Sequence, residues 1–366
     1  MTSPKKKRSA LSLSRGVSPP DPINKEAVSR LKQAKKKQYS TARLLEGIRQ
    51  GDIGMLSRAI TLVESSLPRH RSDAEELITA CLPMSGSAFR IGITGVPGAG
   101  KSTFIEALGN HIIRQGGRLA VLAIDPSSER SRGSIMGDKT RMEVLAGRPE
   151  AYIRPSPSGG TLGGVARKTR ETILLCEAAG FDTIFVETVG VGQSETAVHG
   201  MVDFFLLLML AGAGDELQGI KRGIMEMADA LVINKADGSN IQKAKRAQAE
   251  YANALHLFPP APSGWTVQVK TCSSVYQTGI GEIWQMALDY REHVTGNGYL
   301  EKRRKEQGRY WMYETLREGI FSHAFNDPEM QKALKKHEQA IAEGKATPYM
   351  AAVSILNQYK SLHRHP

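Results

Sequence analysis

The pattern of hydrophobic and polar positions divides the chain into three regions. Residues 26–88 carry apolar side chains at the three- and four-residue spacing of helices and end in a linker of Pro, Ser and Gly. Residues 89–295 alternate between short apolar runs of strand length and longer runs of helical length. Residues 296–366 return to helical spacing alone. We therefore expect an N-terminal helical extension of two or three helices, an α/β domain, and a C-terminal helical segment.

The middle region predicts a mostly parallel sheet with helices on both faces, because strands and helices alternate along it. The expected strands are 89–94, 119–124, 183–187, 204–210, 230–234 and 266–270. The expected helices are 42–49, 53–66, 101–115, 138–146, 165–179, 239–255, 300–322, 328–343 and 348–362. The most apolar run, 202–210, is too short to span a membrane, which takes about 20 residues, so it reads as a buried strand and no membrane association is expected.

A glycine-rich segment after the first strand predicts a phosphate-binding loop. It fits GxxxxGK[ST] and is followed by a helix, the context that the motif requires. Glycines let successive backbone N–H groups turn toward phosphate oxygens, and the helix N-terminus adds positive potential. Lys101 then reaches the β- and γ-phosphates, and the Ser102 hydroxyl ligates Mg²⁺. The nucleotide-binding candidates here are Gly95, Val96, Pro97, Gly98, Ala99, Gly100, Lys101, Ser102 and Thr103.

A second motif predicts that the base is guanine, so that the ligands are GTP and GDP. Asn234, Lys235 and Asp237 form the NKxD pattern directly after a strand. The Asp237 carboxylate can accept hydrogen bonds from N1–H and the N2 amino group of guanine, whereas adenine would leave that charge unpaired. After the next strand, three further residues are expected to line the base: Ser273, Ser274 and Val275.

Candidate switch residues follow two other strands. Glu187 and Gly190 stand where Ras-type G proteins carry DxxG, with Glu in place of Asp, in a stretch that continues through 191–195 as a flexible loop. We expect the Gly190 N–H to bind the γ-phosphate and Glu187 to reach Mg²⁺ directly or through water. Gln193 is either a residue that positions the attacking water or a solvated loop amide.

Further carboxylates are expected at the same sheet edge. Asp125 ends a strand and would face Mg²⁺ or the attacking water, while Asp138 is either another such contact or a helix N-cap. The metal candidates are therefore Ser102, Asp125, Asp138 and Glu187, and the catalytic candidates are Lys101, Asp125, Glu187 and Gln193. A glycine-rich stretch at 211–222 is either a third switch or an ordinary mobile loop.

Composition changes this picture mainly at the N-terminus. The chain has 366 residues and a net charge of +12, of which residues 1–40 supply +9. Residues 1–25 are expected to be a disordered basic arm, with a nucleic-acid or membrane-surface tail as the alternative. The three cysteines favour a reducing compartment, hence the cytoplasm. Because the first twenty residues are basic and free of acids, a mitochondrial presequence stays open, which would place a eukaryotic protein in the matrix.

Residues 89–295 closely resemble the MeaB/ArgK family of methylmalonyl-CoA mutase-associated GTPases. The resemblance is carried by GITGVPGAGKST, AIDPSS, GSIMGDKTRM, GGTLGGVARKTRE, VETVGVGQSE, AGAGDELQGIKRGIMEMAD and VINKADG. It implies a P-loop G domain that hydrolyses GTP, flanked by N-terminal helices and a C-terminal dimerisation arm. Arg132 departs from the family pattern, where Gly is common.

The resemblance also implies a partner that the residues alone do not. Such proteins act as chaperones and gatekeepers of adenosylcobalamin-dependent acyl-CoA mutases and form homodimers, with partner-responsive roles in 218–221. The chief alternative is a transport-associated kinase of basic amino acid uptake, an older label for this family. A nickel-insertion GTPase would need a His-rich tail or a CxxC site, and a signal-recognition GTPase a Met-rich module, and neither is present. Nucleic acid binding through residues 1–40 is the least favoured alternative.

Overall fold

The computed structural model describes residues 39–124, 142–155, 162–188, 194–211 and 222–362. It separates two compact units, residues 1–40 and residues 41–366, and the described helices and strands lie in the second. Several sequence-derived predictions lie outside the described residues: the basic arm at 1–25, Asp125, Arg132, Asp138, Gly190, Gln193 and the stretch 218–221.

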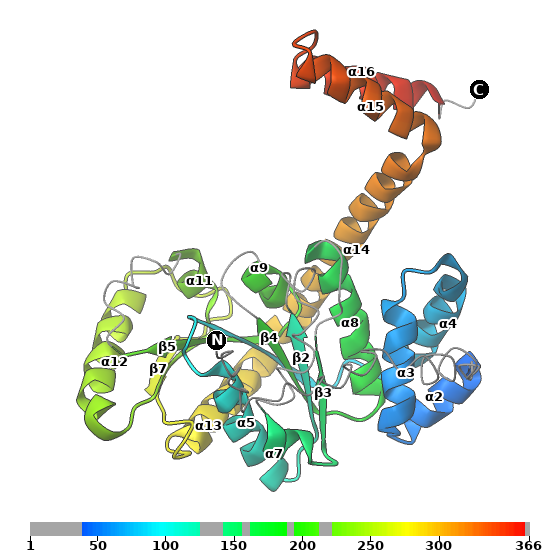
Figure 1. Ribbon diagram of the computed structural model, residues 1–366. Helices are drawn as coiled ribbons and strands as arrows, with labels where there is room; N and C mark the ends of the chain where they lie inside the picture. Colours follow the sequence, from blue (N-terminus) through cyan, green and yellow to red (C-terminus); the bar gives the residue numbers. More distant parts are fainter. Residues whose placement is uncertain (1–38, 125–141, 156–161, 189–193, 212–221, 363–366) are drawn as a thin grey trace, which may run out of the picture. The chain divides into compact units, whose positions relative to one another are not determined.

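A seven-stranded sheet forms the centre of this unit, with the order β3-β2-β4-β1-β5-β6-β7 and all neighbouring strands parallel (Figure 1). The strands are β1 (Phe89–Gly95), β2 (Leu119–Ile124), β3 (Ala151–Arg154), β4 (Thr183–Thr188), β5 (Phe204–Leu210), β6 (Ala230–Asn234) and β7 (Gln268–Thr271). The expectation of a mostly parallel sheet is confirmed. The sequence pattern did not predict β3, because four residues are too few to show a period.

Helices cover both faces of the sheet, as the alternating pattern predicted. The helices connecting or following the strands are α5 (Lys101–Arg114), α7 (Glu143–Ala146), α8 (Leu162–Ala178), α9 (Ser194–His199), α11 (Arg222–Met227), α12 (Ile241–Leu255) and α13 (Ile280–Gly296). Ile91 and Ile93 face the cluster that includes α5, α12 and α13. Gly92 faces the other way, where a Cβ atom would lie 2.9 Å from Val198 of α9. The glycine therefore lets the helix after the switch candidate approach the central strand closely.

Three helices precede the sheet: α2 (Thr41–Arg49), α3 (Ile53–Glu64) and α4 (Arg71–Cys81). Asp52 caps α3 by accepting hydrogen bonds from the backbone N–H groups of Gly54 and Met55. All three helices contact α8, and the Ser57 and Tyr152 hydroxyls lie 3.2 Å apart. The N-terminal helices are thus attached to the sheet through its α8 side.

The C-terminal region consists of α14 (Tyr299–Asn326), α15 (Pro328–Ala342) and α16 (Pro348–Leu362), and α15 packs against α16 (Figure 1). The first turns of α14 are bonded to the sheet. Arg304 donates to both carboxylate oxygens of the buried Asp203, at 2.8 and 2.6 Å, and Arg303 lies 3.5 Å from Oδ2 of Asp229. No helix among the described residues is long and apolar enough to cross a membrane.

Candidate functional site

The loop between β1 and α5 has the backbone that phosphate binding requires. Gly98 and Gly100 have positive φ angles of 77° and 84°, which glycine adopts without strain. At Gly95 a Cβ atom would lie 2.2 Å from the Leu208 carbonyl oxygen, so no larger residue fits there without movement. Inside the loop, the Ala99 N–H donates to the Val96 carbonyl at 3.1 Å. The loop therefore curls at the N-terminus of α5.

The first residues of α5 supply the candidate side chains. Lys101 donates from Nζ to the Gly95 carbonyl at 3.0 Å. Burial lowers the pKa of the Lys101 ammonium, and the nearby carboxylates of Glu187 and Glu195 oppose that shift. Ser102 is half-buried beside it, while Thr103 is exposed, as are Pro97 and Gly98 at the tip of the loop. A cation thus stands at the mouth of the loop with two carboxylates close enough to influence it.

Asn234 joins the phosphate end of the site to the base end. Its Nδ2 donates to the Ala99 carbonyl at 2.8 Å. Its Oδ1 accepts from the N–H and the hydroxyl of Ser274, at 3.1 and 2.8 Å, and from the Cys272 thiol at 3.4 Å. The side chain is buried. One amide thereby ties together the phosphate loop, the end of β6 and the loop after β7.

Asp237 is held by a residue of the neighbouring loop. The Ser273 hydroxyl donates to Asp237 Oδ2 at 2.5 Å. Lys235 has a positive φ of 57°, and its carbonyl accepts from the Asn240 amide at 2.7 Å. Val275 is exposed in the same loop. The carboxylate is therefore fixed in place, which suits a group that must recognise two donors on one base edge.

The end of β4 carries the described part of the first switch candidate. Glu187 is buried, and Thr188 donates its hydroxyl hydrogen to the Thr94 hydroxyl at 2.8 Å. That bond links the carboxyl end of β4 to the end of β1, directly before the phosphate loop. Asp125, Asp138, Gly190 and Gln193 lie outside the described residues.

Comparison with known proteins decides the family. Residues 56–329 match the family model described as "Methylmalonyl Co-A mutase-associated GTPase MeaB". The chain belongs to the MeaB family. It is accordingly a P-loop GTPase, and the resemblance and the fold class expected from the sequence are confirmed.

Individual relatives agree with this assignment along nearly their whole length. A probable GTPase of Mycobacterium tuberculosis is 51% identical over 86% of this chain and 93% of its own. GTPase ArgK of Escherichia coli is 45% identical over 85% of this chain and 94% of its own. The mitochondrial methylmalonic aciduria type A homolog of mouse is 44% identical over 90% of this chain and 81% of its own. A crystal structure of an LAO/AO transport system kinase matches with a TM-score of 0.68 at 37% identity, over 87% of this chain and 97% of that one.

Within this MeaB-family site, two of the four metal candidates lie among the described residues. Ser102 is the second residue of α5 and Glu187 the last but one of β4, so a hydroxyl and a buried carboxylate lie near Lys101. These are hard oxygen ligands, and Mg²⁺ commonly takes one or two such protein groups and completes its shell with phosphate oxygens and water. The described residues contain no cluster of three or more His, Cys, Asp or Glu that would hold a metal without a nucleotide. The pair therefore fits Mg²⁺ that arrives with a nucleotide.

Sequence reasoning missed two contributions to the site. Glu195 was expected in a flexible loop, but it lies in the first turn of α9, is buried, and acts electrostatically on Lys101. The sequence did indicate this helix, because a Ser-Glu pair after a glycine-rich loop is typical of a helix start. Cys272 was expected at the start of the base-side loop, but its thiol contact with Asn234 was not, because it joins residues 38 positions apart and no local pattern indicates it.

Proposed function

We propose that this chain binds GTP with Mg²⁺, hydrolyses it to GDP and phosphate, and acts as a chaperone and gatekeeper for an adenosylcobalamin-dependent acyl-CoA mutase of the methylmalonyl-CoA mutase type. The observation that carries the guanine assignment is the pair of contacts at Asn234 and Asp237. Through these hydrogen bonds, the carboxylate that recognises the base and the loop that binds the phosphates belong to one connected structure.

In the proposed reaction, Lys101 neutralises charge on the β- and γ-phosphates. Mg²⁺ would be held by the Ser102 hydroxyl and the Glu187 carboxylate, where it supplies further charge stabilisation. Gly190 would donate its N–H to the γ-phosphate. Asp125, Asp138 and Gln193 keep the roles inferred from their positions after strands and at a helix start, as ligands of the metal or its waters and as the residue orienting the attacking water.

Support for the mutase partner comes from the family and not from any contact in the chain. The family model is named for its association with methylmalonyl-CoA mutase. The mouse relative is named "Methylmalonic aciduria type A homolog, mitochondrial". For this chain we retain the cytoplasm as the predicted location, or the mitochondrial matrix if its source is eukaryotic.

We further propose that the protein works as a homodimer joined through its C-terminal helices. Large apolar side chains on these helices are more than half exposed, including Tyr313, Phe321, Tyr349, Met350 and Leu356. Single exposed apolar residues are common, but a contiguous set of them marks an interaction surface. A symmetric dimer would cover such a surface on both copies at once.

Purified mutase from the same source provides the test. The affinity of the full-length chain for the mutase should differ between a non-hydrolysable GTP analogue and GDP, and the mutase should accelerate GTP hydrolysis. Lys101→Ala should abolish hydrolysis with or without mutase. A wild-type protein that binds no mutase in any nucleotide state would refute the proposal.

A transport-associated kinase is the second candidate, because one similar crystal structure is named as an LAO/AO transport system kinase. The two candidates differ in where the γ-phosphate goes. A GTPase releases one inorganic phosphate for each GDP formed, whereas a kinase transfers it to a protein. Labelled γ-phosphate recovered on protein in place of free phosphate would favour the kinase.

A further inference from the structure

Glu195 is a buried carboxylate to which the proposed reaction gives no role. It is the second residue of α9, and only 1% of its surface is exposed, while Ser194 before it is 2% exposed. α9 contacts β4, the strand that carries Glu187, and β1, the strand that leads into the phosphate loop. A glutamate is rarely buried to this extent unless a group of opposite charge or a hydrogen-bond donor lies near it. The surroundings of Glu195 therefore indicate what its charge does.

Lys101 supplies positive charge near this carboxylate. Glu187 and Glu195 both act electrostatically on the Lys101 ammonium, which is itself partly buried. In this structure the ammonium donates to the Gly95 carbonyl at 3.0 Å, at the end of β1. A lysine at this position of a phosphate-binding loop pairs with the β- and γ-phosphates of a bound nucleotide. The carboxylates and the phosphates therefore compete for one positive charge.

The two carboxylates differ in how a bound nucleotide would affect them. Glu187 is a candidate ligand of Mg²⁺, so the metal would lie between this carboxylate and the phosphate oxygens and offset their repulsion. Its backbone is also fixed in the sheet, where it pairs with Ile93 of β1. Glu195 is not a metal candidate and lies on a helix outside the sheet. Like charges inside a protein repel each other more strongly than in water, because they are screened less. The charge of the phosphates would therefore act on Glu195 more than on Glu187.

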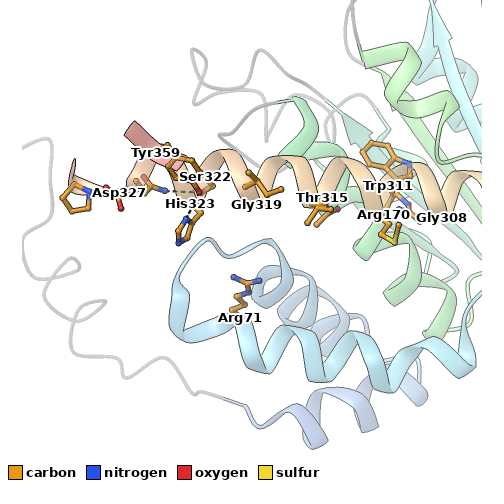
Figure 2. A pocket seen from close by; sticks show the side chains of 15 residues that line it. Arg71, Arg170, Gly308, Trp311, Thr315, Gly319, Ser322, His323, Asp327 and Tyr359 are labelled. Carbon is orange, nitrogen blue, oxygen red and sulfur yellow. Dashed lines mark hydrogen bonds between the residues drawn. The ribbon is translucent and has the colours of Figure 1, made fainter. Parts of the chain in front are cut away.

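The far end of α9 meets the C-terminal helix. α9 has six residues and is about 9 Å long. Gly200 follows it and packs against Trp311 of α14, because a Cβ atom on Gly200 would lie 3.7 Å from Trp311 Nε1. Trp311 in turn lies beside Arg170 of α8, whose guanidinium is 5.5 Å from the centre of the indole ring (Figure 2). A displacement of Glu195 would therefore act through one short helix on the packed contact between α8 and α14.

We propose that Glu195 sets the preference of the site between GTP and GDP. Its carboxylate attracts the Lys101 ammonium and repels the γ-phosphate, so it weakens the binding of GTP relative to that of GDP. This inference rests on the proposed function and adds a residue that discriminates between the two nucleotides. Once the γ-phosphate is lost by hydrolysis, the repulsion ends and Lys101 is again attracted to Glu195. The start of α9 is then held differently in the two nucleotide states.

Glu195→Gln tests the inference, because it keeps the shape of the side chain and removes its charge. Calorimetric titration with Mg²⁺ gives the Kd for GDP and for a non-hydrolysable GTP analogue. We expect the affinity for the analogue relative to GDP to rise about tenfold, equivalent to about 1.4 kcal/mol. When Mg²⁺ is removed with a chelator, the difference between the variant and wild type should increase, because less positive charge then offsets the repulsion. Glu195→Asp keeps the charge and should keep the wild-type ratio.

Glu106→Gln serves as the matched control. Glu106 is a partly buried carboxylate on α5, the helix that begins with Lys101, and its Oε1 accepts from the N–H groups of Val144 and Leu145 at 2.8 and 3.3 Å. Glutamine keeps that acceptor and removes one negative charge, so the ratio of the two affinities should be that of wild type.

Three results would contradict the role of Glu195. An unchanged ratio in Glu195→Gln would overturn the inference, and so would an equal weakening of both nucleotides, because the side chain would then only support the fold of the site. Weaker binding of the GTP analogue alone would also overturn it, because Glu195 would then assist the binding of Mg²⁺ or the γ-phosphate. In each case the wild-type protein still binds guanine nucleotides and the proposed function stands. A wild-type protein that binds neither GTP nor GDP would instead refute the proposed function.

Discussion

The indole N–H of Trp311 donates a hydrogen bond to the Gly200 carbonyl at 2.8 Å. Gly200 directly follows α9, the helix that begins where the first switch candidate ends. Gln307, one turn earlier on α14, donates to the Val202 carbonyl, also at 2.8 Å. Helix α14 is therefore hydrogen-bonded to the residues that directly follow α9. A movement of α9 would act on α14 directly, without a movement of the sheet.

Replacing Gln307 tests this connection. Gln307→Met keeps the length of the side chain and removes the donor to Val202. We expect the GTP affinity to stay within about twofold of wild type, and stimulation of hydrolysis by the mutase to fall. The free energy of unfolding should drop by about 1 kcal/mol, the usual net value of one hydrogen bond. Equal stimulation of both proteins would show that α14 does not report the state of α9.

Substitution of Ser273 separates two roles in the base site, which are holding the Asp237 carboxylate in place and selecting guanine. Its hydroxyl fixes Asp237, so Ser273→Ala should lower the affinity for GDP by about ten- to a hundredfold, in line with about 1.5–3 kcal/mol for a hydrogen bond to a charged group. It should not alter the preference for guanine. Asp237→Asn should, in contrast, lower guanine affinity and raise xanthine affinity, because the donor pattern at the base is inverted. Titration of GDP and XDP by calorimetry gives both values, and a switch to xanthine in Ser273→Ala would contradict this division.

The sequence predicted the residues that form local motifs and missed those that depend on distant partners. Lys101 and Asp237 were found because each stands at a strand end within a short pattern. The expected helices omit α13, although Ile280 and Trp284 have helical spacing, because the glycines at its start favour a loop. Arg303 and Arg304 lie in a charged run that reads as solvent-exposed. They are largely buried because Asp203 and Asp229, about 75 to 100 residues earlier, need partners at the sheet.

His199 predicts how stability changes with pH. Burial, followed by the proximity of Arg303, lowers its pKa from 6.5 to about 4. The unfolded chain therefore binds this proton at a higher pH than the folded protein does. Its contribution to stability is complete above about pH 6.5 and is lost as the pH falls toward 4, with a loss of about 2 kcal/mol by pH 5.

His199→Phe isolates this effect from other acid titrations. The imidazole packs edge-on against Phe205 with ring centres 5.6 Å apart, so an aromatic replacement keeps the contact and removes the titration. Denaturant unfolding at pH 7 and pH 5 should show wild type losing about 2 kcal/mol more than His199→Phe. Parallel losses in the two proteins would mean that the histidine is protonated in the folded state.

The last prediction concerns the dimer. Because the first turns of α14 are bonded to the sheet, this helix cannot be removed without disturbing the fold. Truncation near residue 296 would remove Arg303 and Arg304 and leave Asp229 and Asp203 buried without their cations, which is strongly destabilising. Loss of the dimer could then reflect loss of the fold. Tyr313→Glu with Phe321→Glu avoids this, because both side chains are more than half exposed and the arginines of α14 are kept.

We expect light scattering to give wild type a mass twice the 39.9 kDa of one chain, and the double variant the mass of one chain. Like charges placed at a symmetric contact repel each other and remain desolvated, so two substitutions suffice. GDP affinity should be unchanged, because the nucleotide-site residues Lys101, Asn234 and Asp237 are not altered. Leu257→Glu, at a position that is 83% exposed outside the C-terminal helices, serves as the control and should stay dimeric. A wild-type protein with the mass of a single chain would rule out the proposed dimer.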